Sequence, residues 1–228
     1  MKLLALETAG PWCSAGLMID DQIEQRLEHA PRRHADLVLG MLDDLLAAAG
    51  LPLTELDAIV FGRGPGSFTG VRIAAAVAQG VAFGAERPLI GISTLAATAQ
   101  SAYRQTGERL FACALDARMG EVYWGCFQIQ PGRQVVTATG DEAVVAPAST
   151  DVLNDQRWCS VGDGWTAYPS LVERHRHQIG RRFEATAEAR DLLTLARVKI
   201  EAGSNTNAAD AAPVYLRNRV AEVSRPRN

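Results

Sequence analysis

Short apolar runs separated by polar turns open the chain and predict a meander of three strands. The first run covers residues 2–6 and the second covers residues 14–19, with a polar turn around Gly10 between them. Asp20-Asp21 supplies another turn before a third strand near residues 22–28. We therefore expect the chain to begin with antiparallel strands.

Helices alternate with buried strands in the next part of the chain. Apolar residues at helical spacing predict a helix over residues 35–49, which Gly50 ends. Ser93 or Thr94 is placed to cap a later helix that runs to Tyr103. The other elements expected here are a strand over residues 58–61, a helix over residues 68–84 and a strand over residues 89–92. This order predicts an α/β unit built on a mixed sheet.

A second α/β unit follows a polar boundary at residues 105–108. Residues 109–115 and 121–129 form a hairpin pattern. We divide the chain into a lobe of residues 1–106 and a lobe of residues 107–228. Both open with a hairpin, which indicates structural duplication although no sequence repeat is visible. The later elements expected are a strand near residues 134–138, a short helix after Pro147, a strand over residues 158–161 and a helix over residues 186–202.

Composition and charge limit the function classes. The 228 residues are 47% hydrophobic and 21% charged, with a net charge of −3, and a protein that grips nucleic acid alone usually has a basic surplus. The apolar run over residues 73–85 is too short to span a bilayer. Met1-Lys2 leads into only four apolar residues before Glu7, unlike a signal peptide. We expect a cytoplasmic protein with no membrane partner.

A glycine-rich segment over residues 62–72 follows the buried strand and opens a helix. Free amides at a helix start attract anions, so phosphate binding is one interpretation. A structural turn is the favoured one, because no Lys-Ser/Thr follows the glycines and no acidic partner for a ribose lies at the right distance. We call this segment the signature loop, with the residues Gly62, Gly64, Pro65, Gly66, Ser67, Phe68, Thr69, Gly70 and Arg72.

Two further loops have residues suited to a nucleotide. Glu7 and Thr8 lie in the first hairpin turn, and Asp116 lies at the matching place in the second half. Some two-lobed folds hold a metal nucleotide with carboxylates and hydroxyls of this kind, and Gly162 and Gly164 would then approach the adenosine. An ordinary turn is the favoured interpretation of each loop taken alone, so we predict at most a degenerate nucleotide site.

The histidines and cysteines do not form a recognisable catalytic or metal motif. His34 opens a helix, but position 38 is Val38, so there is no HxxxH pair. The stretch His175-Arg176-His177 is polar and basic, and we expect it at the surface. The four cysteines are scattered without a CxxC pair, which favours reduced, mostly buried thiols. We predict no metal site and no catalytic residue.

Taken together, these segments resemble the TsaB (YeaZ) family over essentially the whole chain. The signature loop is the most specific part, and residues 130–185 are the least diagnostic. The other matching segments are Leu4-Ala5-Leu6-Glu7-Thr8-Ala9, His34-Ala35-Asp36, Gly91-Ile92-Ser93-Thr94-Leu95, Asp116-Ala117-Arg118-Met119-Gly120-Glu121-Val122-Tyr123, Gly162-Asp163-Gly164 and Pro213-Val214-Tyr215-Leu216-Arg217.

The resemblance implies a two-lobed α/β fold of the actin and Hsp70 ATPase class, each lobe a mixed sheet flanked by helices. It implies a role in forming N6-threonylcarbamoyladenosine at position 37 of tRNAs that read codons beginning with A. In that pathway the family is the non-catalytic scaffold that dimerises with the catalytic paralogue TsaD, joined by the small ATPase TsaE. It further implies a homodimer in isolation and contact with tRNA through the complex. No cofactor is expected for this chain alone, and ATP or ADP with magnesium only in the complex.

The two long helices of the first lobe are the interface candidates. Small side chains on the second helix would permit close contact with a partner helix, although both apolar stripes also suit an ordinary core. The resemblance favours the interface. Its candidate residues are His34, Leu37, Met41, Ala74, Ala75, Ala78 and Val81, with Ala78 taken as an exposed small position.

Two alternatives remain open at this point. An independent ATPase or kinase-like enzyme on the same fold would bind nucleotide through Glu7, Thr8, Asp116 and the loop at residues 162–164. A glycoprotease-type metalloprotease is disfavoured because no paired histidines share a helix.

Overall fold

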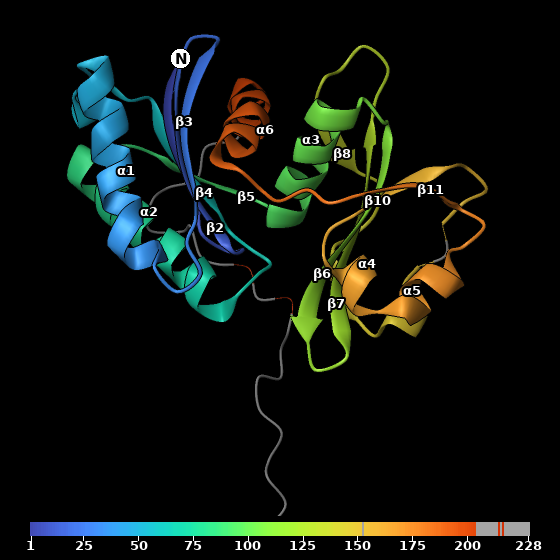
Figure 1. Ribbon diagram of the computed structural model, residues 1–228. Coiled ribbons are helices and arrows are strands. Elements are labelled where there is room, and N and C mark those ends of the chain that lie inside the picture. The colour runs from blue at the N-terminus through green and yellow to red at the C-terminus, as the bar shows by residue number, and fades with distance from the viewer. Residues whose placement is uncertain (152, 204–213, 215, 217–228) are drawn as a thin grey trace, which may run out of the picture.

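The computed structural model describes residues 1–151, 153–203, 214 and 216. Two mixed β-sheets, each with helices on both faces, form two lobes that lie side by side (Figure 1). The segment at residues 213–217 that matched the family falls mostly outside the described residues, which include only Val214 and Leu216 of it.

The first sheet has the strand order β3-β2-β1-β4-β5. Strands β1, β2 and β3 form the antiparallel meander that the apolar runs predict, and β4 and β5 extend it in parallel from β1. Their bounds are β1 Lys2–Glu7, β2 Trp12–Ile19, β3 Gln22–His29, β4 Ala58–Gly62 and β5 Leu89–Ile92. The mixed sheet predicted for this half is therefore confirmed.

The second sheet repeats this topology with the order β11-β10-β6-β7-β8, and β9 pairs with β7. Strands β6 and β7 form the predicted hairpin, and β10 and β11 run parallel to β6 as β4 and β5 run parallel to β1. The duplication inferred from element order is therefore confirmed by strand pairing. The bounds are β6 Leu110–Arg118, β7 Glu121–Ile129, β8 Val136–Ala138, β9 Ala143–Val145, β10 Trp158–Val161 and β11 Ile179–Phe183.

Helices α1 (His34–Ala49) and α2 (Phe68–Ala85) cover one face of the first sheet. Gly50 ends α1 in the left-handed conformation, and the Ser67 hydroxyl caps α2 by accepting a hydrogen bond from the Gly70 amide at 3.1 Å. Among the described residues, α2 alone is long and apolar enough to cross a membrane by length and composition. Its buried alanines pack against the strands, which accounts for that composition.

Helix α6 (Ala189–Glu201) covers the other face of the first sheet, against β1, β2 and β4. The sequence division assigned this part of the chain to residues 107–228, but the apolar side of α6, including Leu192 and Leu193, packs with Leu3 and Val60 of the first lobe. The chain thus crosses back to the first sheet after β11 (Figure 1).

The second sheet lies between α3 and a pair of short helices. Helix α3 (Thr94–Thr106), capped by Ser93, packs on one face, and α4 (Gly164–Ala167) lies on the other with α5 (Pro169–Arg174) beside it. The sequence analysis missed α4, α5, β9 and β11, whose polar or short segments have little apolar periodicity. Two 3₁₀ turns, Leu53–Glu55 and Pro147–Ser149, complete the described elements, and the second replaces the short helix expected after Pro147.

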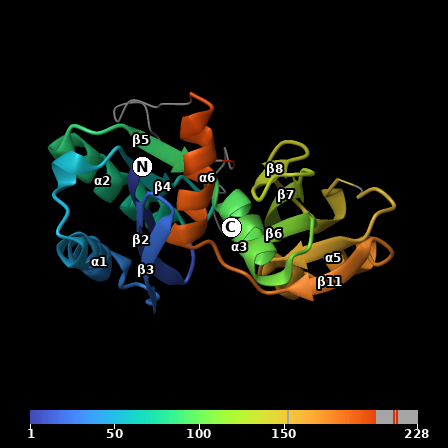
Figure 2. The ribbon, with the colours of Figure 1, turned by 90° about the horizontal axis from the view of Figure 1, so that it is seen from above.

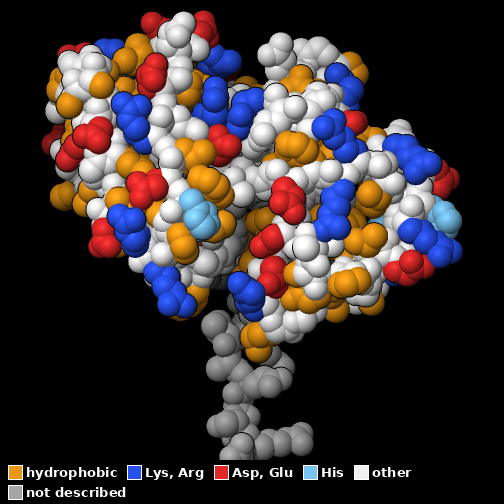
Figure 3. Space-filling view, viewed as in Figure 1, with side chains coloured by type: hydrophobic (Ala, Val, Ile, Leu, Met, Phe, Trp, Pro, Cys, Tyr) orange, Lys and Arg blue, Asp and Glu red, His pale blue; other side chains and the backbone are white. Residues whose placement is uncertain are grey.

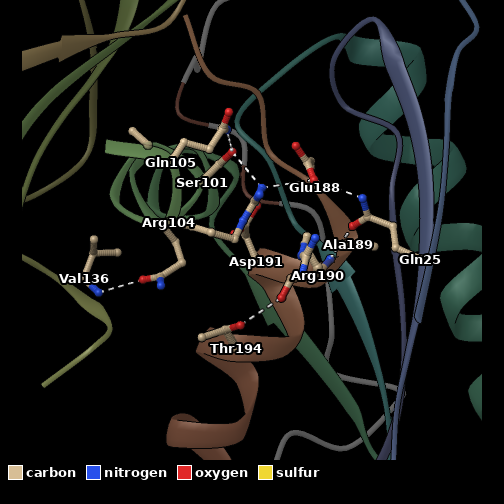
Figure 4. A network of polar contacts seen from close by, with 12 residues as sticks. Gln25, Ser101, Arg104, Gln105, Val136, Glu188, Ala189, Arg190, Asp191 and Thr194 are labelled. Atoms are coloured by element: carbon tan, nitrogen blue, oxygen red, sulfur yellow. Dashed lines mark hydrogen bonds and ion pairs between the residues drawn. The ribbon is translucent and has the colours of Figure 1, made fainter. Parts of the chain in front are cut away.

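Helices α3 and α6 lie side by side between the two sheets and form the junction of the lobes (Figure 2). Arg104 on α3 binds Asp191 on α6 with two hydrogen bonds, Nε to Oδ1 at 3.0 Å and Nη2 to Oδ2 at 3.1 Å. Arg104 also pairs with Glu188 at 3.1 Å, and Glu188 accepts a hydrogen bond from Gln25 of β3 (Figure 4). Burial raises the pKa of Asp191 to about 6, while its bonds with Arg104 lower it.

Candidate functional site

Glu7 ends β1 inside the first lobe and is fully buried. Its Oε1 accepts a hydrogen bond from the Ala9 amide at 2.6 Å, and its Oε2 accepts one from the Thr94 hydroxyl at 3.1 Å. Burial raises the pKa of Glu7 to about 7, and the bonds from Ala9 and Thr94 oppose this increase. The carboxylate that the sequence suggested for a nucleotide is therefore used inside the protein.

The signature loop closes over this carboxylate. A Cβ atom at Gly62 would overlap the carboxylate of Glu7, and one at Gly70 would overlap the carbonyl oxygen of Thr8. The Thr8 hydroxyl donates to the Gly70 carbonyl at 2.7 Å, and the Ser67 amide donates to the Ala9 carbonyl at 2.8 Å. The loop needs glycine because it packs directly on the first hairpin turn.

Several backbone amides of the loop donate hydrogen bonds within the protein. Ser67 and Gly70 donate as described, and the Arg63 amide donates to the Ile92 carbonyl at 2.9 Å. The Gly64 carbonyl accepts from the Thr94 amide, and the Arg63 carbonyl accepts from the amide of Val214 near the end of the chain, both at 2.9 Å. These contacts support the structural-turn interpretation, because the amides of Arg63, Ser67 and Gly70 are already bonded and are not available to a phosphate.

Asp116 lies near the end of β6, close to the matching hairpin turn of the second lobe. Its Oδ1 accepts hydrogen bonds from the Tyr168 hydroxyl and the Arg118 amide, both at 2.8 Å, and its own amide donates to Asp163 at 2.9 Å. Gly162 and Gly164 lie against the backbone of Ala114, so a side chain at either position would overlap it. This set holds the start of α4 against β6. Among the described residues, no hydrogen bond joins it to the Glu7 set.

The N-terminus of α3 connects carboxylates from both lobes, which the sequence analysis did not anticipate. Thr94 binds Glu7 of the first lobe, and the Ser93 hydroxyl donates to Glu142, which precedes β9 in the second lobe. Burial raises the pKa of Glu142, and the bond from Ser93 lowers it. Glu142 lies in the polar segment Gly140-Asp141-Glu142, where a sequence pattern gives no sign of burial.

The buried sides of α1 and α2 include most of the predicted interface residues. Ala74, Ala75 and Ala78 of α2 belong to the core of the first lobe, together with Met41 of α1. His34 is also buried, and its Nε2 has no hydrogen-bond partner in the part of the chain that the structure describes. The expectation that Ala78 is exposed was therefore wrong. Leu37 and Val81 are half-buried at the margin of this core.

The outer sides of the same helices expose large apolar side chains. Leu39 of α1 is 52% exposed, and Phe68 and Phe83 of α2 are 57% and 83% exposed. The Arg72 guanidinium lies 3.2 Å from the centre of the Phe68 ring. Small exposed residues separate these side chains, namely Gly40, Ala76, Gly80 and Gly84. We call Leu39, Gly40, Phe68, Ala76, Gly80, Phe83 and Gly84 the α1–α2 face.

The histidines and cysteines follow the sequence expectations only in part. His175 is buried, stacks on Trp124 with ring centres 5.3 Å apart, and shares a hydrogen bond with the Thr150 hydroxyl at 2.9 Å, so the surface expectation was wrong for it. Burial lowers the pKa of His175 to about 4. His177 is exposed as expected. All four cysteines are free, and Cys126 alone of them is not fully buried.

Comparison with known protein families identifies close relatives of the chain. Residues 28–224 match the family described as "TsaD: tRNA N6-adenosine threonylcarbamoyltransferase". The tRNA threonylcarbamoyladenosine biosynthesis protein TsaB of Escherichia coli (strain K12) is 40% identical over 224 residues, which cover 97% of this chain and 96% of the relative. The protein of the same name from Haemophilus influenzae is 37% identical over 232 residues, covering 96% and 95% of the two chains.

Solved structures agree with this comparison. YeaZ from Pseudomonas aeruginosa superposes with a TM-score of 0.87 at 43% identity and covers 94% of this chain and 99% of its own. A second structure, of an uncharacterized protein with similarity to peptidase YEAZ from the same organism, gives a TM-score of 0.88 at 43% identity and covers 95% and 99%. These matches and the two duplicated sheets confirm the two-lobed α/β fold of the actin and Hsp70 ATPase class.

Proposed function

The chain belongs to the TsaB (YeaZ) family of tRNA threonylcarbamoyladenosine biosynthesis proteins, and we propose that it is a non-catalytic scaffold and activator of that pathway. It acts in the cytoplasm by dimerising with a catalytic TsaD-like subunit. The complex forms N6-threonylcarbamoyladenosine at position 37 of tRNAs that read codons beginning with A. A TsaE-like ATPase joins the complex.

The exposed apolar side chains of the α1–α2 face are the observation that carries this proposal. Phe83, Phe68 and Leu39 remain in contact with water in the isolated chain, although burying a large apolar side chain is favourable by about 1.5–3 kcal/mol. Exposed aromatic residues beside glycines and alanines allow a partner helix to approach closely. We propose that the TsaD-like subunit covers this face, and that a second copy of the chain covers it in the absence of that subunit.

The closed state of the predicted nucleotide residues supports a non-catalytic role. Glu7 and Thr8 are buried under the signature loop, and Gly162 lies against Ala114. A nucleotide that used these residues would first have to displace contacts within the protein. ATP or ADP with magnesium therefore belongs to the complex in our proposal.

Reconstitution tests the proposal most directly. The chain is co-purified with the TsaD-like protein of the same cell, and threonylcarbamoylation of tRNA is measured with and without it. We expect a stable complex and a large loss of activity when the chain is omitted. Undiminished activity without the chain would overturn the proposal.

The independent ATPase makes a different prediction. Its nucleotide would raise the melting temperature of the isolated chain, because a ligand that binds only the folded state stabilises it. We expect no change with ATP and magnesium. A clear increase, together with ATP hydrolysis by the isolated chain, would favour the ATPase.

A further inference from the structure

The outer edge of the second lobe concentrates arginine. Residues 174–183 contain four arginines, two histidines and no aspartate or glutamate, in a chain whose net charge is −3. Strand β11 lies within this segment and is the last strand of its sheet. Arg157, which precedes β10, lies alongside and donates from Nη1 to the Ile179 carbonyl at 3.3 Å. Arginines of β11 and of the segment before β10 therefore lie close together at one edge.

The strand geometry directs these side chains to both sides of the edge. Arg181 and Arg182 pair in register with Cys159 and Ser160 of β10, and successive side chains of a strand point to opposite faces. Arg182 donates to the Thr166 hydroxyl on α4, while Arg181 lies over the Phe183 ring at 5.6 Å. Both arginines are exposed.

Three of these arginines have no neutralising carboxylate partner among the described residues. Across the described residues, no carboxylate oxygen lies within 4.0 Å of a side-chain nitrogen of Arg157, Arg181 or Arg182, although Arg104 and Arg197 elsewhere have such partners. Arg176 pairs with Glu173 at 2.7 Å, but both side chains are exposed, so water weakens the pair. Figure 3 shows Lys and Arg side chains, with Asp and Glu side chains near them, on the outer side of the second lobe, where β11 and α5 lie in Figure 1.

We propose that this arginine edge, formed by Arg157, Arg176, Arg181 and Arg182, contacts the phosphate backbone of tRNA in the assembled complex. The proposal rests on the proposed function, which supplies the RNA. The planar guanidinium presents paired N–H groups that match phosphate oxygens, and arginines without carboxylate partners keep their charge available. A patch of four arginines on a chain of negative net charge gives weak binding alone, so the contact operates when the other subunits also hold the RNA.

Charge removal tests the edge in the reconstituted complex. The variants are Arg181→Gln/Arg182→Gln and the same pair with Arg157→Gln. The control matched to the double variant, Arg133→Gln/Arg197→Gln, removes two positive charges elsewhere on the surface, and adding Arg26→Gln to it matches the triple variant. We expect the KM for tRNA to rise about tenfold in the triple variant with kcat unchanged, and the slope of log affinity against log salt to become shallower by about 2–3. The control should match the wild type, and Arg181→Lys/Arg182→Lys should retain most of the affinity.

Three results would overturn the proposal. The first is an unchanged KM and salt slope in the triple variant. The arginines would then serve only to prevent the edge strand from pairing with other chains, and the triple variant should aggregate. Loss of complex formation on gel filtration would make the edge a protein contact. An equal rise in the KM for tRNA in the control would mean that the change depends on net charge and not on the arginine edge. Failure of the proposed function is recognised separately, by full activity when the wild-type chain is omitted.

Discussion

The carboxylate of Glu7 lies directly on the α-carbon of Gly62, so that no side chain fits between them. Glu7 ends the first strand, and Gly62 ends the parallel strand beside it. The glycine that begins the signature loop therefore gives space to a buried acid. This contact explains why position 62 is glycine without invoking a bound phosphate. It also shows that a carboxylic acid with a raised pKa lies inside the first lobe.

Stability should fall as the pH rises through the titration of Glu7. Its pKa is about 7 in the folded protein against 4.5 for the exposed group, so between these values the unfolded chain ionises first and folding loses free energy. The variant Glu7→Gln lacks this cost. We compare the free energy of unfolding of this variant with that of the wild type by urea denaturation. The difference should shift in favour of the variant by about 3 kcal/mol as the pH rises from about 4.5 to above 7.

The control for this experiment is Glu24→Gln, which removes an exposed carboxylate from β3. Its difference from the wild type should stay nearly constant with pH. A constant difference for Glu7→Gln as well would mean that the Glu7 carboxylate ionises normally in the folded protein.

Adding one methyl group at Gly62 should destabilise the protein strongly. Gly62→Ala would force the new Cβ atom onto the Glu7 carboxylate, and we expect a loss of about 3 kcal/mol or failure to fold. The matched variant Gly40→Ala meets no atom within 4 Å and lies inside α1, so it should stabilise the chain by about 0.5–1 kcal/mol. Equal melting temperatures for the two variants would contradict the packing.

The sequence predicted elements well where the contrast between apolar and polar positions is strong. The hairpin of β6 and β7 and the strand Trp158–Val161 were expected within a few residues of their observed bounds. Helix α2 was expected too, but which of its sides faces the core was not. Small apolar residues occur on all sides of this helix, so no polar face marks the side exposed to solvent. Ala78 and Ala76 look alike in sequence, yet the first is buried and the second is exposed.

Long-range contacts account for the other differences. His175 lies among polar residues along the chain, and the side chains that bury it, Trp124 of β7 and Trp165 of α4, come from other elements. The leucines of helix α6 pack on the apolar face of the first sheet. The periodicity of the helix predicts that it has an apolar side, but it cannot indicate which sheet that side covers. The candidate residues Glu7 and Asp116 were expected in turns, but they lie near the ends of strands β1 and β6. Their internal hydrogen bonds depend on partners up to 87 positions away, which the sequence pattern does not indicate.

Breaking the ion pair at the lobe junction should cost more at neutral pH than in acid. Asp191 is buried, so Arg104→Ala leaves an unpaired carboxylate, and we expect a loss of about 3 kcal/mol at pH 7. The loss should shrink near pH 5, because removing Arg104 raises the pKa of Asp191 further above about 6 and the acid then becomes neutral. Urea denaturation at both pH values measures this difference.

The exposed pair of Arg197 and Asp21 provides the comparison for the junction. Arg197→Ala should change stability by less than about 1 kcal/mol at either pH, since surface pairs contribute little. A pH-independent loss for Arg104→Ala would show that Asp191 stays ionised without its partner.

A charge on the α1–α2 face should separate partner binding from folding. Phe83 is 83% exposed, so Phe83→Glu should leave the melting temperature nearly unchanged while weakening both the homodimer and the TsaD-like complex at least tenfold, as loss of a central aromatic contact does. Leu27→Glu on β3 adds the same charge at another exposed apolar position and should leave both affinities intact. Calorimetry that finds unchanged affinities for Phe83→Glu would place the partner on another surface.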